Sequence, residues 1–288
     1  MSQDVWAQPT QHLPRGKRGC LQVLLIGILL FVIATVVLFL TGNPNLFPTV
    51  ILIGNFLVPI AFVAFLFDHQ HLSALTPETV GKSFALGGIL GVLGASILES
   101  LLIPLPSNPN QGLPLTSALA VGLIEESCKI LAVMFLARRM QHTTEIDGLL
   151  LGAAVGMGFA ALESTGYAFT AFIASHGQVT ASIVSTVLRG LIAPFGHGVW
   201  TGILGAVLFR QSGPRHFRIN GWVILTFLFV TILHGFWDGL PNTLFFVIPP
   251  GIPISVTLLL LSAIGIIVLA VLYRRSIRQK IATTGHLQ

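Results

Sequence analysis

Apolar stretches recur along the chain, and each is about as long as a helix that crosses a membrane. The apolar core of a bilayer requires roughly 20 residues in helical form. A window of about 19 residues separates eight such stretches. The linkers between them are rich in Gly, Pro, Asn and Ser, which end helices. The pattern predicts an all-α, polytopic membrane helix bundle. The eight predicted spans are residues 20–41, 48–67, 83–104, 116–137, 148–174, 190–209, 221–240 and 252–273.

Composition agrees with this pattern. Of the 288 residues, 53% are hydrophobic and only 9% are charged, whereas soluble domains carry about 25% charged residues. We therefore predict three regions: a cytoplasmic tail at 1–19, an eight-span domain at 20–273 and a basic cytoplasmic tail at 274–288. The stretch 178–192 is less apolar. It is either a short helix near the outer surface or an early part of the sixth span.

The first apolar run is expected to stay in the mature protein. A cleaved signal peptide has an apolar core of roughly 7–15 residues followed by small residues. The run at 20–40 is longer, and the sequence "FLTGNPN" after it is a poor cleavage site. The two cysteines, Cys20 and Cys128, fall in different apolar segments and imply no disulfide framework.

The basic residues predict the orientation. Of fifteen Lys and Arg residues, thirteen fall on alternate connections or tails, and two, Lys129 and Arg189, lie in or near the membrane. By the positive-inside rule, this alternation places both termini in the cytoplasm. The net charge of +5 therefore reflects membrane insertion and contact with the lipid bilayer. It does not indicate nucleic-acid binding.

Five acidic residues and two histidines fall inside the predicted spans. Each such group costs roughly 2.5 kcal/mol or more at the centre of a bilayer, so these groups face a bundle interior or a wet cavity and usually mark function. The seven are Glu99, Glu125, Glu126, Glu163, His197, His234 and Asp238.

Most of these groups are predicted to share one depth. Glu125 lies nine residues into the fourth span, about 14 Å from its outer end, and His234 lies about 9 Å below the outer end of the seventh. Glu163 and His197 also lie toward the outer half of their spans. Four helices thus bring polar groups to a similar level.

Helical spacing predicts which groups share a face. Residues i and i+4 are neighbours on a helix, as are Glu125 with Lys129 and His234 with Asp238. Glu126 points about a hundred degrees away from Glu125. Two histidines with carboxylates suit a zinc-type ion with an open water position. Such an ion acidifies its bound water, and a nearby glutamate can take the proton. Hydrolysis of a peptide bond in or beside the membrane would follow.

At these residues the chain resembles the PrsW family of intramembrane metalloproteases, within the CAAX-protease and bacteriocin-immunity superfamily. Four motifs carry the resemblance in order, on spans four to seven, within about residues 80–273. They are Glu-Glu-x-x-Lys (Glu125, Glu126, Lys129), Phe-x-x-x-Glu (Phe159, Glu163), "APFGHGVWTG" (His197) and His-x-x-x-Asp (His234, Asp238).

The resemblance implies a multi-pass peptidase of a bacterial cytoplasmic membrane. Its substrate would be a membrane-anchored protein or peptide, such as an anti-sigma factor cut on the extracytoplasmic side. Glu126 is the predicted general base, and Glu125 shares that task or binds metal. The predicted metal ligands are His197, His234, Asp238 and Glu163, with Glu163 alternatively orienting a ligand. The predicted cofactor is a divalent metal, preferably zinc, although some members of the superfamily are glutamate-type proteases that use no metal.

Other interpretations stay open at this point. Membrane-embedded Glu, His and Asp also form proton relays, so an ion- or proton-coupled transporter is an alternative. A non-catalytic membrane scaffold of the same fold is another. Glu125 and Glu126 can be a structural ion cluster with Lys129. Glu99 belongs to no motif, and we predict a structural or gating role for it. Arg189 either faces the outer headgroups or pairs with an acid.

Overall fold

A computed structural model of the chain describes residues 19–68, 73–104, 112–140, 144–240, 244–248 and 252–285. The basic N-terminal tail predicted before residue 19 lies outside these residues. Within them, a long helix forms at each predicted span. The elements are α1 (Gly19–Thr41), α2 (Leu46–Asp68), α3 (Pro77–Lys82), the π-helical η2 (Ser83–Gly87), α4 (Gly88–Leu102), α5 (Leu115–Ala137), α6 (Glu145–Ala174), α7 (Val179–Gln211), α8 (Gly221–Gly239), β1 (Phe245–Ile248), β2 (Ile252–Ser255) and α9 (Val256–Gly285).

This architecture confirms the predicted all-α membrane bundle. By length and apolar composition, seven helical segments among the described residues can cross a membrane. The segment formed by α3, η2 and α4 is one of them. Helix α5 is not, because Glu125, Glu126 and Lys129 interrupt its apolar character. Among the described residues, β1 and β2 form a short antiparallel pair, called the hairpin below, which the sequence pattern did not predict.

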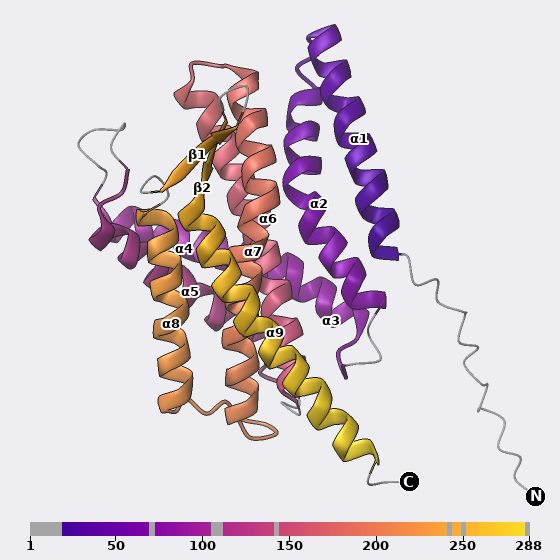
Figure 1. The fold of residues 1–288 in the computed structure, drawn as a ribbon, viewed down its shortest axis with the longest axis vertical. Helices are drawn as coiled ribbons and strands as arrows, with labels where there is room; N and C mark the ends of the chain where they lie inside the picture. Colours follow the sequence, from indigo (N-terminus) through magenta and orange to yellow (C-terminus); the bar gives the residue numbers. More distant parts are fainter. Residues whose placement is uncertain are drawn as a thin grey trace, which may run out of the picture.

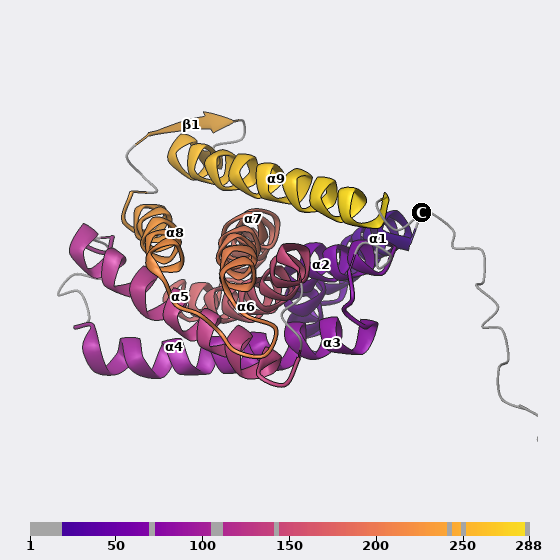
Figure 2. The same ribbon diagram turned by 90° about the horizontal axis from the view of Figure 1, so that it is seen from below.

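Helices α6 and α7 form the centre of the bundle and run along its long axis (Figures 1 and 2). The other helices surround them. The α1–α2 and α6–α7 connections and the β hairpin lie at one end of the molecule, whereas the α7–α8 connection and the C-terminal end of α9 lie at the other (Figure 1). The α1–α2 and α6–α7 connections, which have no Lys or Arg, thus lie at the opposite end from the basic α7–α8 connection, as the distribution of basic residues predicted. We call the end with the hairpin the outer end, following that prediction.

Helices α4 and α5 are steeply inclined to the central pair. Figure 2, which looks along the long axis, shows α6, α7 and α8 nearly end-on but α4 and α5 lengthwise. A residue count along α5 therefore overestimates the depth of its glutamates. Their level is set by contacts with α7 and α8, described below.

Glycines bring the central helices into backbone contact. A Cβ added at Gly152 of α6 would lie 2.3 Å from the carbonyl oxygen of Thr201, and one added at Gly156 would lie 2.2 Å from the carbonyl oxygen of His197. No side chain fits in such a space, so small residues allow the close packing of α6 on α7. The position of His197 depends directly on this contact.

Two further glycine contacts fix the inclined helices. Gly88 of α4 packs on the backbone of Gly158 in α6, where an added Cβ would lie 2.6 Å from the carbonyl carbon. Gly122 of α5 packs on the backbone of α8, where an added Cβ would lie 2.8 Å from the carbonyl oxygen of Thr231. The second contact lies one helical turn from Glu125 and Glu126, so it positions them against α8.

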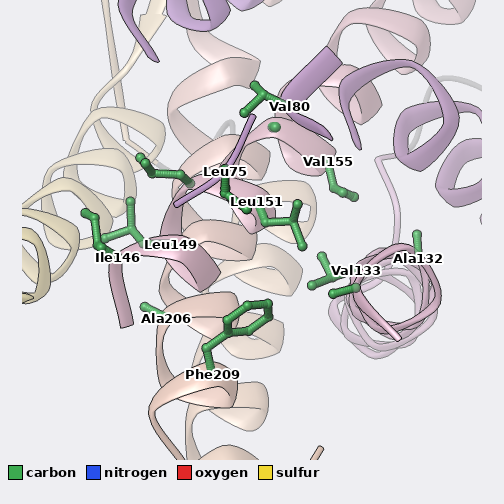
Figure 3. Close-up of a cluster of buried hydrophobic side chains, with 13 residues drawn as sticks. Leu75, Val80, Ala132, Val133, Ile146, Leu149, Leu151, Val155, Ala206 and Phe209 are labelled. Atoms are coloured by element: carbon green, nitrogen blue, oxygen red, sulfur yellow. The ribbon is translucent and has the colours of Figure 1, made fainter. Parts of the chain in front are cut away.

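The hydrophobic core has two parts. One cluster joins α5, α6 and α7 with α3 and the residues just before it, and includes Leu151, Val155 and Phe209 (Figure 3). A second cluster joins α7, α8 and α9 around Trp200. In contrast, α1 buries only Leu38, and its many exposed apolar side chains suit contact with lipid.

Two boundaries differ from the sequence pattern. Helix α7 begins at Val179 and continues through Pro194, so the stretch 178–192 is an early part of the sixth long helix. Helix α9 begins after the hairpin and continues to Gly285, so most of the predicted basic tail is helical.

Candidate active site

The glutamates of α5 and the lysine one turn later form a buried ion cluster. The Nζ of Lys129 donates hydrogen bonds to Oε2 of Glu125 at 2.9 Å and to Oε1 of Glu126 at 3.0 Å. The exposed fraction is 4% for Glu125 and 0% for the other two residues. Three charges at this depth are expensive unless paired, and here one ammonium serves both carboxylates.

The same lysine reaches a second helix. Its Nζ lies 2.8 Å from Nδ1 of His197 in α7. An ammonium has no acceptor capacity, so Nδ1 accepts this hydrogen bond, and a neutral imidazole then carries its proton on Nε2. That Nε2 lies 2.9 Å from Oε2 of Glu163 in α6. Lys129 thereby fixes both the orientation and the tautomer of His197.

His234 of α8 approaches the cluster from the other side. Its Nδ1 lies 2.9 Å from Oε1 of Glu126. Its Nε2 lies 3.4 Å from Oε2 of Glu125 and 3.4 Å from Oδ2 of Asp238. This Nε2 is buried and makes no hydrogen bond in the described residues. Glu126 therefore orients the ring, while the opposite nitrogen is free to bind a proton, a water or an ion.

Aromatic rings enclose the polar groups. The ring of Phe159 lies over the Lys129 ammonium, 3.9 Å from Nζ to the ring centroid, and it also packs on His197. Trp200 is fully buried and packs on both histidine rings, at centroid distances of 5.7 Å to His197 and 4.9 Å to His234. Nothing in the spacing of Trp200 along the sequence indicates that it has two histidine neighbours.

Glu163 has a cationic partner that the motifs do not contain. Arg189 of α7 donates from Nη2 to Oε2 of Glu163 at 2.7 Å, and its guanidinium stacks on Tyr167 at 3.7 Å. The alternative in which Arg189 pairs with an acid is the one observed. The signal in the sequence was a single cation in a span region, with no indication of which acid it meets.

A cavity of about 490 Å³ adjoins the cluster between α4, α5 and α6. Its wall includes the carboxylates of Glu125 and Glu163, and also Glu99. Glu126, His197 and His234 do not line it. The cavity extends over the outer halves of α5 and α6. A substrate in this cavity would therefore meet Glu125 first, with Glu126 behind it.

Comparison with known proteins identifies the family. The model of the family described as "PrsW family intramembrane metalloprotease" matches residues 76–273, which extend from α3 into α9.

The chain belongs to the PrsW family.

Two curated relatives agree with this assignment. Over 173 residues the chain is 28% identical to Protease PrsW of Bacillus subtilis (strain 168), a match that covers 58% of this chain and 73% of the relative. Over 183 residues it is 24% identical to Protease PrsW of Halalkalibacterium halodurans, a match that covers 62% of this chain and 78% of the relative. No solved structure matched the chain. Membership of the PrsW family, with seven long apolar segments, supports a multi-pass membrane protease that acts on a protein substrate.

The metal that the family description implies fits part of this cluster. Glu125, His197 and His234 each offer one ligand atom, and these atoms lie within 4.8 Å of one another. Three protein ligands with an open position are typical of catalytic zinc. The hydrogen bond from Nδ1 of His234 to Glu126 is the support that metal-binding histidines usually have. These three residues can hold a metal ion, provided that Lys129 moves away from Nδ1 of His197.

The other predicted ligands lie at the edge of this group. Asp238 approaches Nε2 of His234, and its carboxylate is placed to join the coordination or to orient that ring. Glu163 lies on the far side of His197 and is held by Arg189. Its contacts are those of a residue that orients His197.

Proposed function

We propose that this PrsW-family chain hydrolyses a peptide bond of a membrane-associated protein, in the cavity between α4, α5 and α6. The observation that carries the proposal is the position of Glu125: a carboxylate with 4% exposure that lines a cavity of about 490 Å³ and is held by an ammonium and a histidine. The cavity extends toward the predicted outer end, which supports cleavage near the extracytoplasmic side of a bacterial cytoplasmic membrane.

In this mechanism Glu125 takes the proton of the attacking water. A base must lie within hydrogen-bonding reach of the water that attacks the carbonyl carbon, and Glu125 lines the cavity, whereas Glu126 does not. We therefore place the base at Glu125 in preference to Glu126. The proton then passes to the amide nitrogen as the bond between carbon and nitrogen breaks. Nε2 of His234, 3.4 Å from Glu125, is positioned to share that proton.

The remaining residues prepare this centre. Lys129 offsets part of the charge of the two adjacent carboxylates. Glu126 orients His234, and Glu163 with Arg189 orients His197. A divalent metal held by His197, His234 and one carboxylate oxygen of Glu125 would polarise the carbonyl and lower the pKa of its bound water toward about 7, and the other oxygen of Glu125 would accept the proton. The surrounding rings of Phe159 and Trp200 exclude bulk water, which strengthens each electrostatic contact.

For the substrate, we propose a membrane-anchored protein, with an anti-sigma factor as the specific candidate that the family resemblance suggests. The described loops are short, so recognition would occur in the cavity and within the membrane. The alternative function, a proton-coupled carrier, receives less support, because the acids and histidines of the four motifs form one contact network beside a single cavity.

The test is a comparison of new N-termini in membranes of the host cell. Membranes with the wild-type chain are compared by quantitative mass spectrometry with membranes carrying Glu125→Gln or Glu78→Gln, which replaces an exposed acid in α3. We expect fragments cut near the outer ends of membrane spans in the wild type and in Glu78→Gln, and none in Glu125→Gln. The same fragments in all three samples, or in none, would reject the proposal.

A further inference from the structure

Three helix faces form the wall of the cavity. Along α4 and its C-terminal end, the residues that line the cavity recur at intervals of one, three or four positions between Val92 and Ile103. Along α6, they recur in the same way between Phe159 and Thr170. Such spacing means that one continuous face of each helix lines the space. The volume of about 490 Å³ falls within the roughly 300–1,000 Å³ typical of binding pockets. The cavity is large enough for several side chains of an extended peptide.

Three carboxylates line this cavity, and two of them have cationic partners. Glu125 is paired with Lys129 at 2.9 Å, and Glu163 is paired with Arg189 at 2.7 Å. The third, Glu99 of α4, has no ion pair among the described residues. Its Oε1 is buried and has no hydrogen-bond partner there. The charges around it act in both directions: Glu163 and Asp238 repel it, whereas Lys129 and His234 attract it without an ion pair at contact distance.

A carboxylate in such a position needs a partner. Burying an ionised group without a hydrogen bond or an opposite charge is costly, and the cost is greater in a membrane. Lys129 and Arg189 are already engaged by other acids. Apart from a proton, the remaining source of positive charge for Glu99 is a cationic group of a molecule that enters the cavity.

We propose that Glu99 is a specificity-determining residue that binds a Lys or Arg side chain of the substrate. This inference rests on the proposed peptidase function and deepens it. Because Glu99 and Glu125 line the same cavity, the bound cation belongs to a residue near the scissile bond, and an extended peptide advances roughly 3.3 Å per residue. Val92, Ala95 and Ile103 of the same lining face suit the aliphatic part of such a side chain.

The experiment uses the purified chain in liposomes and a set of quenched fluorescent peptides. The peptides share one sequence with an apolar anchor and carry Lys, Gln or Glu at a single position, which is moved through three places on each side of the cleaved bond. We expect a place where the wild type cleaves the Lys peptide with a kcat/KM at least about tenfold above that of the Glu peptide.

The variants separate charge recognition from a structural effect. Glu99→Gln should bring the Lys-to-Glu ratio close to one, and Glu99→Lys should reverse the preference. Glu78→Gln, the exposed control, should keep the wild-type ratio. Size-exclusion profiles in detergent check that each variant is folded, and the ratio within one variant is independent of its active fraction.

Two failures can be told apart. If the wild type cleaves Lys, Gln and Glu peptides equally at every position, or if Glu99→Gln keeps the preference, the role of Glu99 is wrong and the peptidase function stands. If no peptide is cleaved by the wild type, the proposed function is wrong and the inference fails with it. If cleavage survives Glu125→Gln, the role of Glu125 is wrong and the position of Glu99 relative to the cleaved bond is wrong with it.

Discussion

Nδ1 of His234 lies 2.9 Å from Oε1 of Glu126, which leaves Nε2 of the same ring directed toward Glu125 and Asp238. The contact joins α8 to α5 and assigns different positions to two adjacent glutamates. Glu126 is fully enclosed and supports a histidine, whereas Glu125 reaches both that histidine and the cavity. The chemistry proposed here follows from this division.

Metal binding should depend on His234. We expect the purified wild-type chain to contain about one divalent ion per molecule, and His234→Ala to contain none, because Nε2 is a central donor of the group formed with Glu125 and His197. Elemental mass spectrometry of the protein in mild detergent gives the ratio. His216→Ala, which removes an exposed histidine, should keep the ion. A wild-type chain that cleaves substrate with no bound metal would contradict this assignment.

Replacing Lys129 should destabilise the fold strongly. Lys129→Met leaves two buried carboxylates without their shared cation, and breaking a buried ion pair in this way costs about 3–5 kcal/mol. Unfolding by titration from mild detergent into SDS gives the change in free energy. The matched control is Lys82→Met, since Lys82 pairs with Glu78 at the surface with 62% of its side chain exposed. Such exposed pairs contribute about 0–1 kcal/mol. Equal effects of the two substitutions would refute the structural role of the buried cluster.

The contact between α6 and α7 should not tolerate a methyl group. Gly156→Ala places a Cβ 2.2 Å from the carbonyl oxygen of His197, so α7 must shift and carry His197 with it. We expect a loss of about 1–3 kcal/mol of stability and a fall in kcat. Gly81→Ala, where an added Cβ meets nothing within 4 Å, should be neutral or up to about 1 kcal/mol stabilising. An active, stable Gly156→Ala protein would show that the close packing is not required.

Arg189 should act on catalysis through Glu163. Arg189→Met removes the 2.7 Å ion pair and leaves Glu163 to hold His197 alone. Loss of such an orienting contact typically costs about 10–100-fold, and we expect it in kcat with little change in KM. Arg189→Lys should restore part of the rate. Combining Arg189→Met with Glu163→Gln should cost less than the sum of the two effects, because both break one network. Fully additive effects would mean that the two residues act separately.

The gathering of polar groups could be predicted from the sequence. Charged and histidine side chains in four consecutive spans have few ways to avoid lipid other than to meet one another. The structure joins them directly through the contacts of Lys129 with His197 and of Glu126 with His234. Helical spacing alone also predicted the pairing of Glu125 with Lys129.

Other features depend on packing that no local pattern encodes. Glu125 and Glu126 are neighbours in the chain, and the rotation of α5 between α4 and α8 decides which one meets the cavity. That rotation is set by the contact of Gly122 with the backbone of Thr231, more than a hundred residues away in the sequence. The steep inclination of α4 and α5 arises in the same way, because an apolar span gives its length but not its tilt.

The central claim is that Glu125 activates water for peptide hydrolysis, and cleavage in isotopically labelled water tests it most directly. The purified chain in liposomes cleaves a membrane-anchored peptide in ¹⁸O-water, and mass spectrometry reads the new carboxyl terminus. We predict ¹⁸O in that carboxylate for the wild type, a loss of rate of at least about 1,000-fold in Glu125→Gln and a smaller loss of about 10–100-fold in Glu126→Gln. Labelled product formed at the wild-type rate by Glu125→Gln, or an uncleaved peptide with the wild type, would contradict the account.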